Sequence, residues 1–160
     1  MAAPPLDFCE NESKTIPLSG RLSGADSNGI WSETSLFPSS SGAFNPLSGI
    51  FKTDGQAPGT YIFAYTVIGK LPCPDAVTEV KVIIHKTPTA DAGIDKVLIC
   101  GDPIQTLGGT GTSVINMQHL WSLNGQPVAY SPEYEASMIG TYSLLVTSNF
   151  GCTALDYANV

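Results

Sequence analysis

The four cysteines are the residues of this 160-residue chain best suited to covalent or metal chemistry. They stand far apart, with no Cys-x-x-Cys pair and no pair of histidines close by, at Cys9, Cys73, Cys100 and Cys152. Because a zinc site needs closely spaced ligands, this spacing argues against bound zinc. The cysteines instead predict disulfides, which form in an oxidising, extracytoplasmic compartment and allow three pairings here. Two pairs of buried free thiols are the alternative.

Catalytic motifs are missing from this sequence. It has no Gly-x-Ser-x-Gly motif, and Gly109-Thr110-Gly111 lacks both the third glycine and the βαβ setting of a dinucleotide site. His85 and His119 both fall on predicted strands, where they do not indicate a nucleophile–histidine pair. Paired glycosidase carboxylates need a cleft, for which small all-β modules offer little room. We therefore predict that the chain is not an enzyme and has no catalytic residue and no cofactor.

Three aspartates near the middle of the chain raise the question of calcium. Asp91, Asp95 and Asp102 could supply several of the oxygen ligands that Ca²⁺ prefers. The segment is not an EF-hand loop, however, and aspartate is common in turns. Both interpretations stay open, and no metal ligand is predicted.

The elements that must position these residues follow from an internal repeat. The order cysteine, tryptophan, Gly-Thr-Tyr, cysteine occurs twice, with cysteine-to-tryptophan separations of 22 and 21 residues. The repeat selects the disulfides Cys9–Cys73 and Cys100–Cys152, each closing one module and stabilising it by roughly 4 kcal/mol. A large aromatic on a strand of so small a module is most simply a core anchor. The predicted anchors are Trp31, Tyr61, Trp121 and Tyr142.

The domain organisation follows the same repeat. We expect a loose lead-in over residues 1–8, a first module over 9–87 and a second over 88–160, with Thr87-Pro88-Thr89-Ala90 as a semi-rigid spacer. Abundant Gly, Pro, Ser and Thr with few charges predict an all-β fold of short strands and turns.

Three stretches carry particular strand signals. Residues 59–69 form the clearest strand, with Tyr61, Phe63, Tyr65 and Val67 on one face, and residues 76–86 return as its hairpin partner. Residues 97–100 are expected to be the first strand of the second module. Asn124-Gly125 predicts a two-residue hairpin.

Net charge and hydropathy exclude other classes. A formal charge of −7 with scattered Lys and Arg disfavours nucleic acid as a partner. No run of 18 apolar residues is present, so we predict no membrane insertion. Met1-Ala2-Ala3 is typical of a start added to an excised fragment, so we expect that a native leader was removed. The last strand expected, over residues 153–160, is about five residues shorter than its counterpart in the first module, so we expect that further modules follow.

The sequence resembles a family of repeats. It is similar to the PKD-like/Ig-like repeats of very large Bacteroidota surface proteins, including the repeat adhesins of gliding bacteria. The second module carries the resemblance in Ala90-Asp91-Ala92-Gly93-Ile94-Asp95, Cys100, Thr106-Leu107-Gly108-Gly109, Trp121-Ser122, Gly140-Thr141-Tyr142 and Gly151-Cys152-Thr153. The first module resembles a companion type in Gly29-Ile30-Trp31-Ser32, Gly42-Ala43-Phe44-Asn45-Pro46, Pro58-Gly59-Thr60-Tyr61 and Pro72-Cys73-Pro74. Trp121-Ser122-Leu123-Asn124-Gly125 departs from the usual PKD Trp-x-Phe-Gly-Asp-Gly, so Ig-like is the better label.

The resemblance implies tandem antiparallel Ig-like β-sandwiches of an exported cell-surface protein. The implied role is a structural or adhesive extension module, as part of an adhesin or a filament. Its partners would be neighbouring Ig-like modules, other copies of the chain or surface glycans. The alternative is a carbohydrate-binding accessory of a secreted polysaccharide-degrading enzyme, which needs a row of exposed aromatic side chains. The candidates for that row are Phe37, Phe44, Phe51, Tyr130 and Tyr134.

Overall fold

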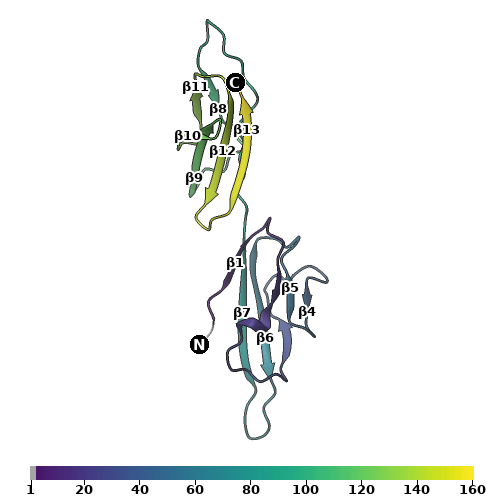
Figure 1. Ribbon diagram of the computed structural model, residues 1–160. Coiled ribbons are helices and arrows are strands. Elements are labelled where there is room, and N and C mark those ends of the chain that lie inside the picture. The colour runs from purple at the N-terminus through teal and green to yellow at the C-terminus, as the bar shows by residue number, and fades with distance from the viewer. Residues whose placement is uncertain (1–2) are drawn as a thin grey trace. The chain divides into compact units, whose positions relative to one another are not determined.

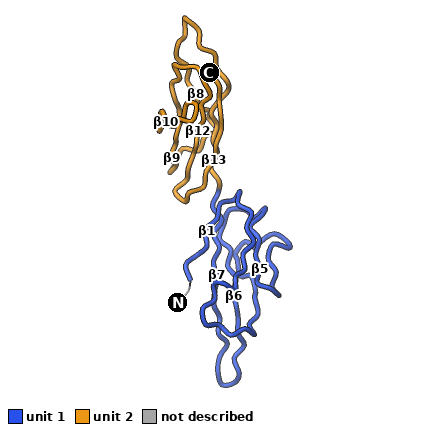
Figure 2. Tube along the Cα trace, viewed as in Figure 1, with its two compact units in different colours: residues 1–86 blue, residues 87–160 orange. Residues whose placement is uncertain are grey.

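The chain is an all-β protein. Its computed structural model describes residues 3–160 and contains thirteen strands and one short 3₁₀ turn, η1 (Leu18–Arg21), over that range. It divides into two compact units, residues 1–86 (unit 1) and 87–160 (unit 2), shown in blue and orange in Figure 2. No helix in the described range is long and apolar enough to cross a membrane.

The larger sheet of unit 1 is built around the strand that the sequence predicted most clearly. Its order is β1-β7-β6-β3, with β1 (Leu6–Cys9), β3 (Ile30–Glu33), β6 (Gly59–Val67) and β7 (Ala76–His85) (Figure 1). β6 pairs antiparallel with β7 along its whole length, from Gly59–Ile84 to Val67–Ala76. Tyr61, Phe63 and Tyr65 are buried on one face, as the alternation predicted.

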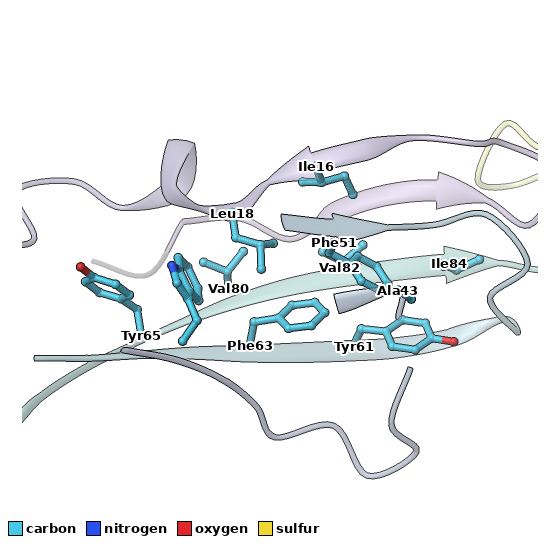
Figure 3. Packing of buried hydrophobic residues seen from close by; sticks show 11 residues of the cluster. Ile16, Leu18, Ala43, Phe51, Tyr61, Phe63, Tyr65, Val80, Val82 and Ile84 are labelled. Carbon is cyan, nitrogen blue, oxygen red and sulfur yellow. The ribbon is translucent and has the colours of Figure 1, made fainter. Parts of the chain in front are cut away.

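The smaller sheet of unit 1 covers that face. It has the order β2-β5-β4, with β2 (Thr15–Pro17), β4 (Phe44–Asn45) and β5 (Ile50–Lys52). Figure 3 shows the core between the two layers, with Ile16 and Phe51 reaching from the small sheet toward Phe63, Val80 and Val82 of the large one. The unit is therefore a two-layer β-sandwich.

Unit 2 repeats this plan with its own core. Its larger sheet has the order β10-β9-β12-β13, with β9 (Met117–Leu123), β10 (Gln126–Ala129), β12 (Thr141–Ser148) and β13 (Thr153–Asn159). The opposite layer is a two-stranded sheet of β8 (Gln105–Leu107) and β11 (Tyr134–Ala136). Leu107 and Ala136 of that layer are buried in one cluster with Trp121, Tyr142 and Leu144.

The two-residue hairpin predicted at Asn124-Gly125 is confirmed. Gln126 of β10 pairs with Leu123 of β9, which leaves two residues in the loop. Both have positive φ, 49° at Asn124 and 83° at Gly125. This is the type I′ geometry, whose twist matches that of the flanking strands.

Two expectations about the starts of the modules are wrong. The lead-in expected over residues 1–8 is partly a strand, since Leu6–Cys9 pairs parallel with Val82–His85 of β7; residues 1–2 of that expectation lie outside the described range. The strand expected over residues 97–100 is only an isolated bridge between Ile99 and Asp102. Val97 and Ile99 are exposed there, so an apolar run without a layer to cover it forms no strand.

Candidate functional site

The four predicted core anchors lie on equivalent strands of the two units. Trp31 and Trp121 lie on β3 and β9, Tyr61 and Tyr142 lie on β6 and β12, and all four side chains are buried. Each tyrosine hydroxyl donates a hydrogen bond of 2.8 Å to the backbone carbonyl four residues earlier, at Ala57 and Met138. Burial, aided by Glu33 near Tyr61 and Tyr134 near Tyr142, raises the pKa of both tyrosines above 10. These buried side chains stabilise the two cores, and Trp31 also lines a cavity of about 350 Å³ at one end of unit 1.

Burial of the Trp121 side chain costs free energy because one of its polar atoms is unpaired. Its indole Nε1 is buried and has no hydrogen-bond partner among the described residues. An unpaired buried donor of this kind costs about 1–3 kcal/mol. The packing of its rings against Tyr134 and the rest of the core offsets that cost.

The predicted disulfide Cys9–Cys73 is not formed. Cys73 is a free, exposed thiol, whereas Cys9 is disulfide-bonded. Cys9 pairs with His85 at the end of β7, while Cys73 precedes the start of that strand at Ala76. Ten residues of strand span about 30 Å, far beyond the roughly 7 Å between Cα atoms that a disulfide allows. The parallel pairing of β1 is therefore what separates the two cysteines.

The predicted disulfide Cys100–Cys152 is not formed either. Cys100 is a free, exposed thiol, and Cys152 is buried and disulfide-bonded. Cys152 immediately precedes β13, whereas Lys96 donates a backbone hydrogen bond to Asn159 at the end of β13. Cys100 follows Lys96 in the exposed loop at that far end of the strand, so the two cysteines lie at opposite ends of unit 2.

The three aspartates considered for calcium do not converge. The Asp91 carboxylate accepts hydrogen bonds of 3.0 Å from the backbone N–H groups of Gly93 and Gly111. Asp95 accepts one of 2.8 Å from the Asn159 N–H, which lowers its pKa. Asp102 accepts from Gln105. Across residues 3–160 no group of three acidic, histidine or cysteine side chains is placed to hold a metal ion.

The two histidines are engaged in the fold. The imidazole of His85 lies 2.7 Å from the carboxylate of Asp7, across the β1–β7 pairing. His119 is buried and its Nε2 lies 2.8 Å from the Ser113 carbonyl. The hydrogen bonds of both rings therefore serve to join neighbouring segments.

The five candidate aromatics do not form an exposed row. Phe37 and Tyr130 are about four-fifths exposed, but they belong to different units. Phe51 is fully buried. Phe44 packs on Phe63 with ring centroids 4.8 Å apart, and Tyr134 packs on Tyr142 at 5.6 Å. Three of the five side chains therefore pack in or against the two hydrophobic cores.

The main hollow of the described surface lies at one end of unit 1. Three cavities of about 730, 350 and 220 Å³ share lining residues where the loop of residues 23–29 meets the ends of β6 and β7. Asp26 lines all three, and Asn28 and Lys70 line the largest. No sequence pattern indicated this site, because residues 23–29 have an ordinary turn composition and Lys70 lies more than 40 residues further along the chain.

Comparison with known proteins places the fold. No family model matches the chain, and no curated protein sequence matches it. The insect immune protein hemolin is similar in structure, with 12% identity over 100% of this chain and 45% of that chain and a TM-score of 0.50. The N-terminal four Ig domains of Dscam1 isoform 7.44 give 12% identity over 99% and 44%, with a TM-score of 0.44. Immunoglobulin domains 1–4 of Sidekick-1 give 13% identity over 99% and 47%, with a TM-score of 0.46.

The chain spans less than half the length of these structures. At such low identity the likeness to hemolin concerns the fold alone. Together with the two-layer architecture, it shows that this all-β chain has an immunoglobulin-like fold.

Proposed function

We propose that the chain is a structural and adhesive extension module of an exported cell-surface protein, made of two tandem Ig-like domains. The observation that carries this proposal is that each unit encloses a separate buried core between its own two layers. A unit that buries its own core can fold independently and serve as one domain of an extended protein.

The comparisons support an adhesive role. The hemolin structure is described as having implications for homophilic adhesion, and this chain aligns with 45% of it. The chain's own partners would then be neighbouring Ig-like modules, a second copy of the chain or surface glycans. An extracellular location, and an origin among Bacteroidota surface proteins as the sequence motifs suggest, belong to the same proposal.

The use of polar side chains supports a role without catalysis. Aspartates that could serve as acids, bases or ligands instead accept hydrogen bonds from nearby N–H and O–H groups, as Asp54 does from Ser13 and Asp75 from Gly69. Such bonds stabilise loops. We infer that the molecule acts by holding and presenting its loops.

A bead assay tests the adhesive role. Beads coated with the purified chain should aggregate with one another, or attach to glycan-coated glass, more than albumin-coated beads do. Beads carrying the reduced, alkylated and unfolded chain are the matched control. Chain-coated beads that stay as dispersed and unattached as albumin beads on every surface would refute the adhesive role.

The alternative of a carbohydrate-binding accessory with an aromatic platform loses its main support. Only Phe37 and Tyr130 of its five side chains are strongly exposed, and these two belong to different units. Binding of sugar by stacking along a row of rings is therefore not proposed.

A further inference from the structure

The cavity group at the end of unit 1 has the dimensions of a small-molecule site. Its largest member, about 730 Å³, falls within the range of roughly 300–1,000 Å³ that ligand pockets occupy. Asp26 and Ser27 also line the neighbouring cavity of about 350 Å³. The three hollows therefore surround one loop, residues 23–29, which we call the Asp26 loop.

The core of unit 1 holds the Asp26 loop in place. The Tyr65 hydroxyl donates to the Asp26 carbonyl at 2.7 Å and accepts from the Gly29 N–H at 2.8 Å. Tyr65 is itself buried and packs against Trp31, with ring centroids 4.9 Å apart and the ring planes tilted by 51°. Figure 3 shows the Tyr65 hydroxyl at one end of the core cluster. A side chain at Gly29 would collide with the Tyr65 ring at 2.4 Å, so the loop rests directly on the ring.

The opposite wall of the cavity is also fixed. The Gly69 N–H donates to the Asp75 carboxylate at 2.8 Å, and the Cys73 N–H donates to the Lys70 carbonyl at 2.8 Å. These bonds fold the β6–β7 turn back on itself beside Lys70. Both walls are thus shaped before any ligand arrives, which reduces the entropy cost of binding.

Asp26 differs from every other aspartate of the chain. The sequence has eight aspartates, all within the described residues, and seven carboxylates accept a hydrogen bond from the protein. The carboxylate of Asp26 accepts none from the part of the chain that the structure describes, although its backbone carbonyl does. Turn aspartates normally bond to nearby backbone N–H groups. The one aspartate carboxylate that accepts no hydrogen bond from the described residues, whether from backbone or from side chain, is the one that lines all three cavities.

Further unused polar groups line the same hollow. The side chains of Ser27, Asn28 and Lys70 form no hydrogen bond with the described residues, and all three line the largest cavity. Val67 and Ile68 supply an apolar part of the wall. The site therefore offers a carboxylate, an amide, a hydroxyl and an ammonium group beside an aliphatic surface, and its opposite charges balance.

We propose that this cavity binds a neutral saccharide, with the Asp26 carboxylate and the Asn28 amide on its hydroxyl groups. Neighbouring sugar hydroxyls need both acceptors and donors, which these two side chains provide. The C–H face of a sugar ring fits the aliphatic wall of Val67 and Ile68. A single carboxylate does not make a metal site, and a single Lys does not make a phosphate-binding patch. The inference deepens the proposed adhesive function by naming a ligand class, but binding itself rests on the cavity.

The test begins with the intact 160-residue chain on an array of neutral and acidic oligosaccharides. The strongest neutral hit is then titrated into ¹⁵N-labelled protein while amide NMR shifts are followed. Saturable shifts should cluster at residues 26–29 and 68–70. Asp26→Asn and Asn28→Ala should each weaken binding about tenfold or more, since hydrogen bonds to charged or buried polar groups contribute that much.

A matched control removes a carboxylate elsewhere in unit 1. Glu79 is exposed on β7 and lines none of the cavities, so Glu79→Gln should leave the dissociation constant unchanged. Ala76→Trp, at an exposed position of the cavity wall, should abolish binding without changing the unfolding midpoint.

Three results would overturn the proposal. They are no saccharide binding by the wild-type chain, saturable shifts confined to other residues, and unchanged affinity of Asp26→Asn. If beads coated with the Asp26→Asn variant still attach, and wild-type beads still attach when free sugar is added, the adhesive function stands and the saccharide site is refuted. If beads coated with the wild-type chain neither aggregate nor attach, but the chain in solution still binds the sugar, the saccharide site stands and the adhesive function is refuted.

Discussion

The hydroxyls of Tyr61 and Tyr142 perform the same task in the two units, bonding back to a carbonyl four residues earlier. We predict that Tyr61→Phe and Tyr142→Phe each lower the free energy of unfolding by about 1–2 kcal/mol, because a partly buried carbonyl loses its donor. Urea unfolding followed by tryptophan fluorescence measures this. Tyr157→Phe is the control, since Tyr157 is exposed and its hydroxyl makes no hydrogen bond with the described residues. An equal loss in all three variants would contradict the prediction.

The raised pKa values of Tyr61 and Tyr142 set the direction of an alkaline effect. Burial keeps both phenols neutral in the folded state above pH 10, where tyrosines of the unfolded chain ionise. The unfolded state then binds fewer protons, so stability is unaffected well below pH 10 and falls as pH rises through and above it. Absorbance at 295 nm should show two tyrosines that ionise late, together with unfolding. Titration of all tyrosines near pH 10 in the folded protein would count against this.

At the scale of elements, the loop of residues 108–113 depends on a glycine that contacts Asp91. A side chain at Gly109 would meet the Asp91 carboxylate at 1.9 Å, and that carboxylate also accepts from the Gly111 N–H. Gly109→Ala should therefore displace Asp91 and destabilise unit 2 by about 1–3 kcal/mol, the usual cost of overpacking. Gly101→Ala, with nothing within 4 Å, should change stability little. Thermal unfolding compares the two, and similar melting temperatures would refute the packing argument.

At the scale of the whole molecule, the state of the cysteines gives a direct chemical test. Cys73 and Cys100 are exposed thiols, so the native, unreduced chain should react with two equivalents of a thiol reagent. Cys73→Ser and Cys100→Ser should each remove one equivalent, and the double variant should react with none. The pairing predicted from the repeat, by contrast, requires that the wild-type chain have no reactive thiol.

The two compact units lead to a second prediction at this scale. Residues 3–86 and 87–160, expressed separately and studied under reducing conditions, should each unfold cooperatively, because each has its own buried cluster. Dispersed amide NMR spectra and urea transitions measure this. A disordered spectrum for either piece would show that the tandem-domain proposal is wrong.

Local patterns were the parts of the fold that sequence reasoning predicted well. Alternation placed Tyr61, Phe63 and Tyr65 on the buried face of β6, and Asn124-Gly125 produced the expected type I′ hairpin. These features depend on neighbouring residues and on the two-residue period of a strand. The strand predicted from the apolar run over residues 97–100 was wrong, because strand formation there would need a second layer to cover the run, and none does.

The sequence by itself thus determined the fold class, the central strands and the buried aromatic residues, because periodicity and turn chemistry act over a few residues. Only the tertiary structure decided which cysteines stay free, since the parallel pairing of β1 puts Cys9 and Cys73 at opposite ends of β7. It also decided that the Asp26 carboxylate, unlike those of the other seven aspartates, accepts no hydrogen bond from the described residues and lines a cavity together with Lys70. Such choices depend on which distant segments meet, and the spacing of residues along a chain does not encode that directly.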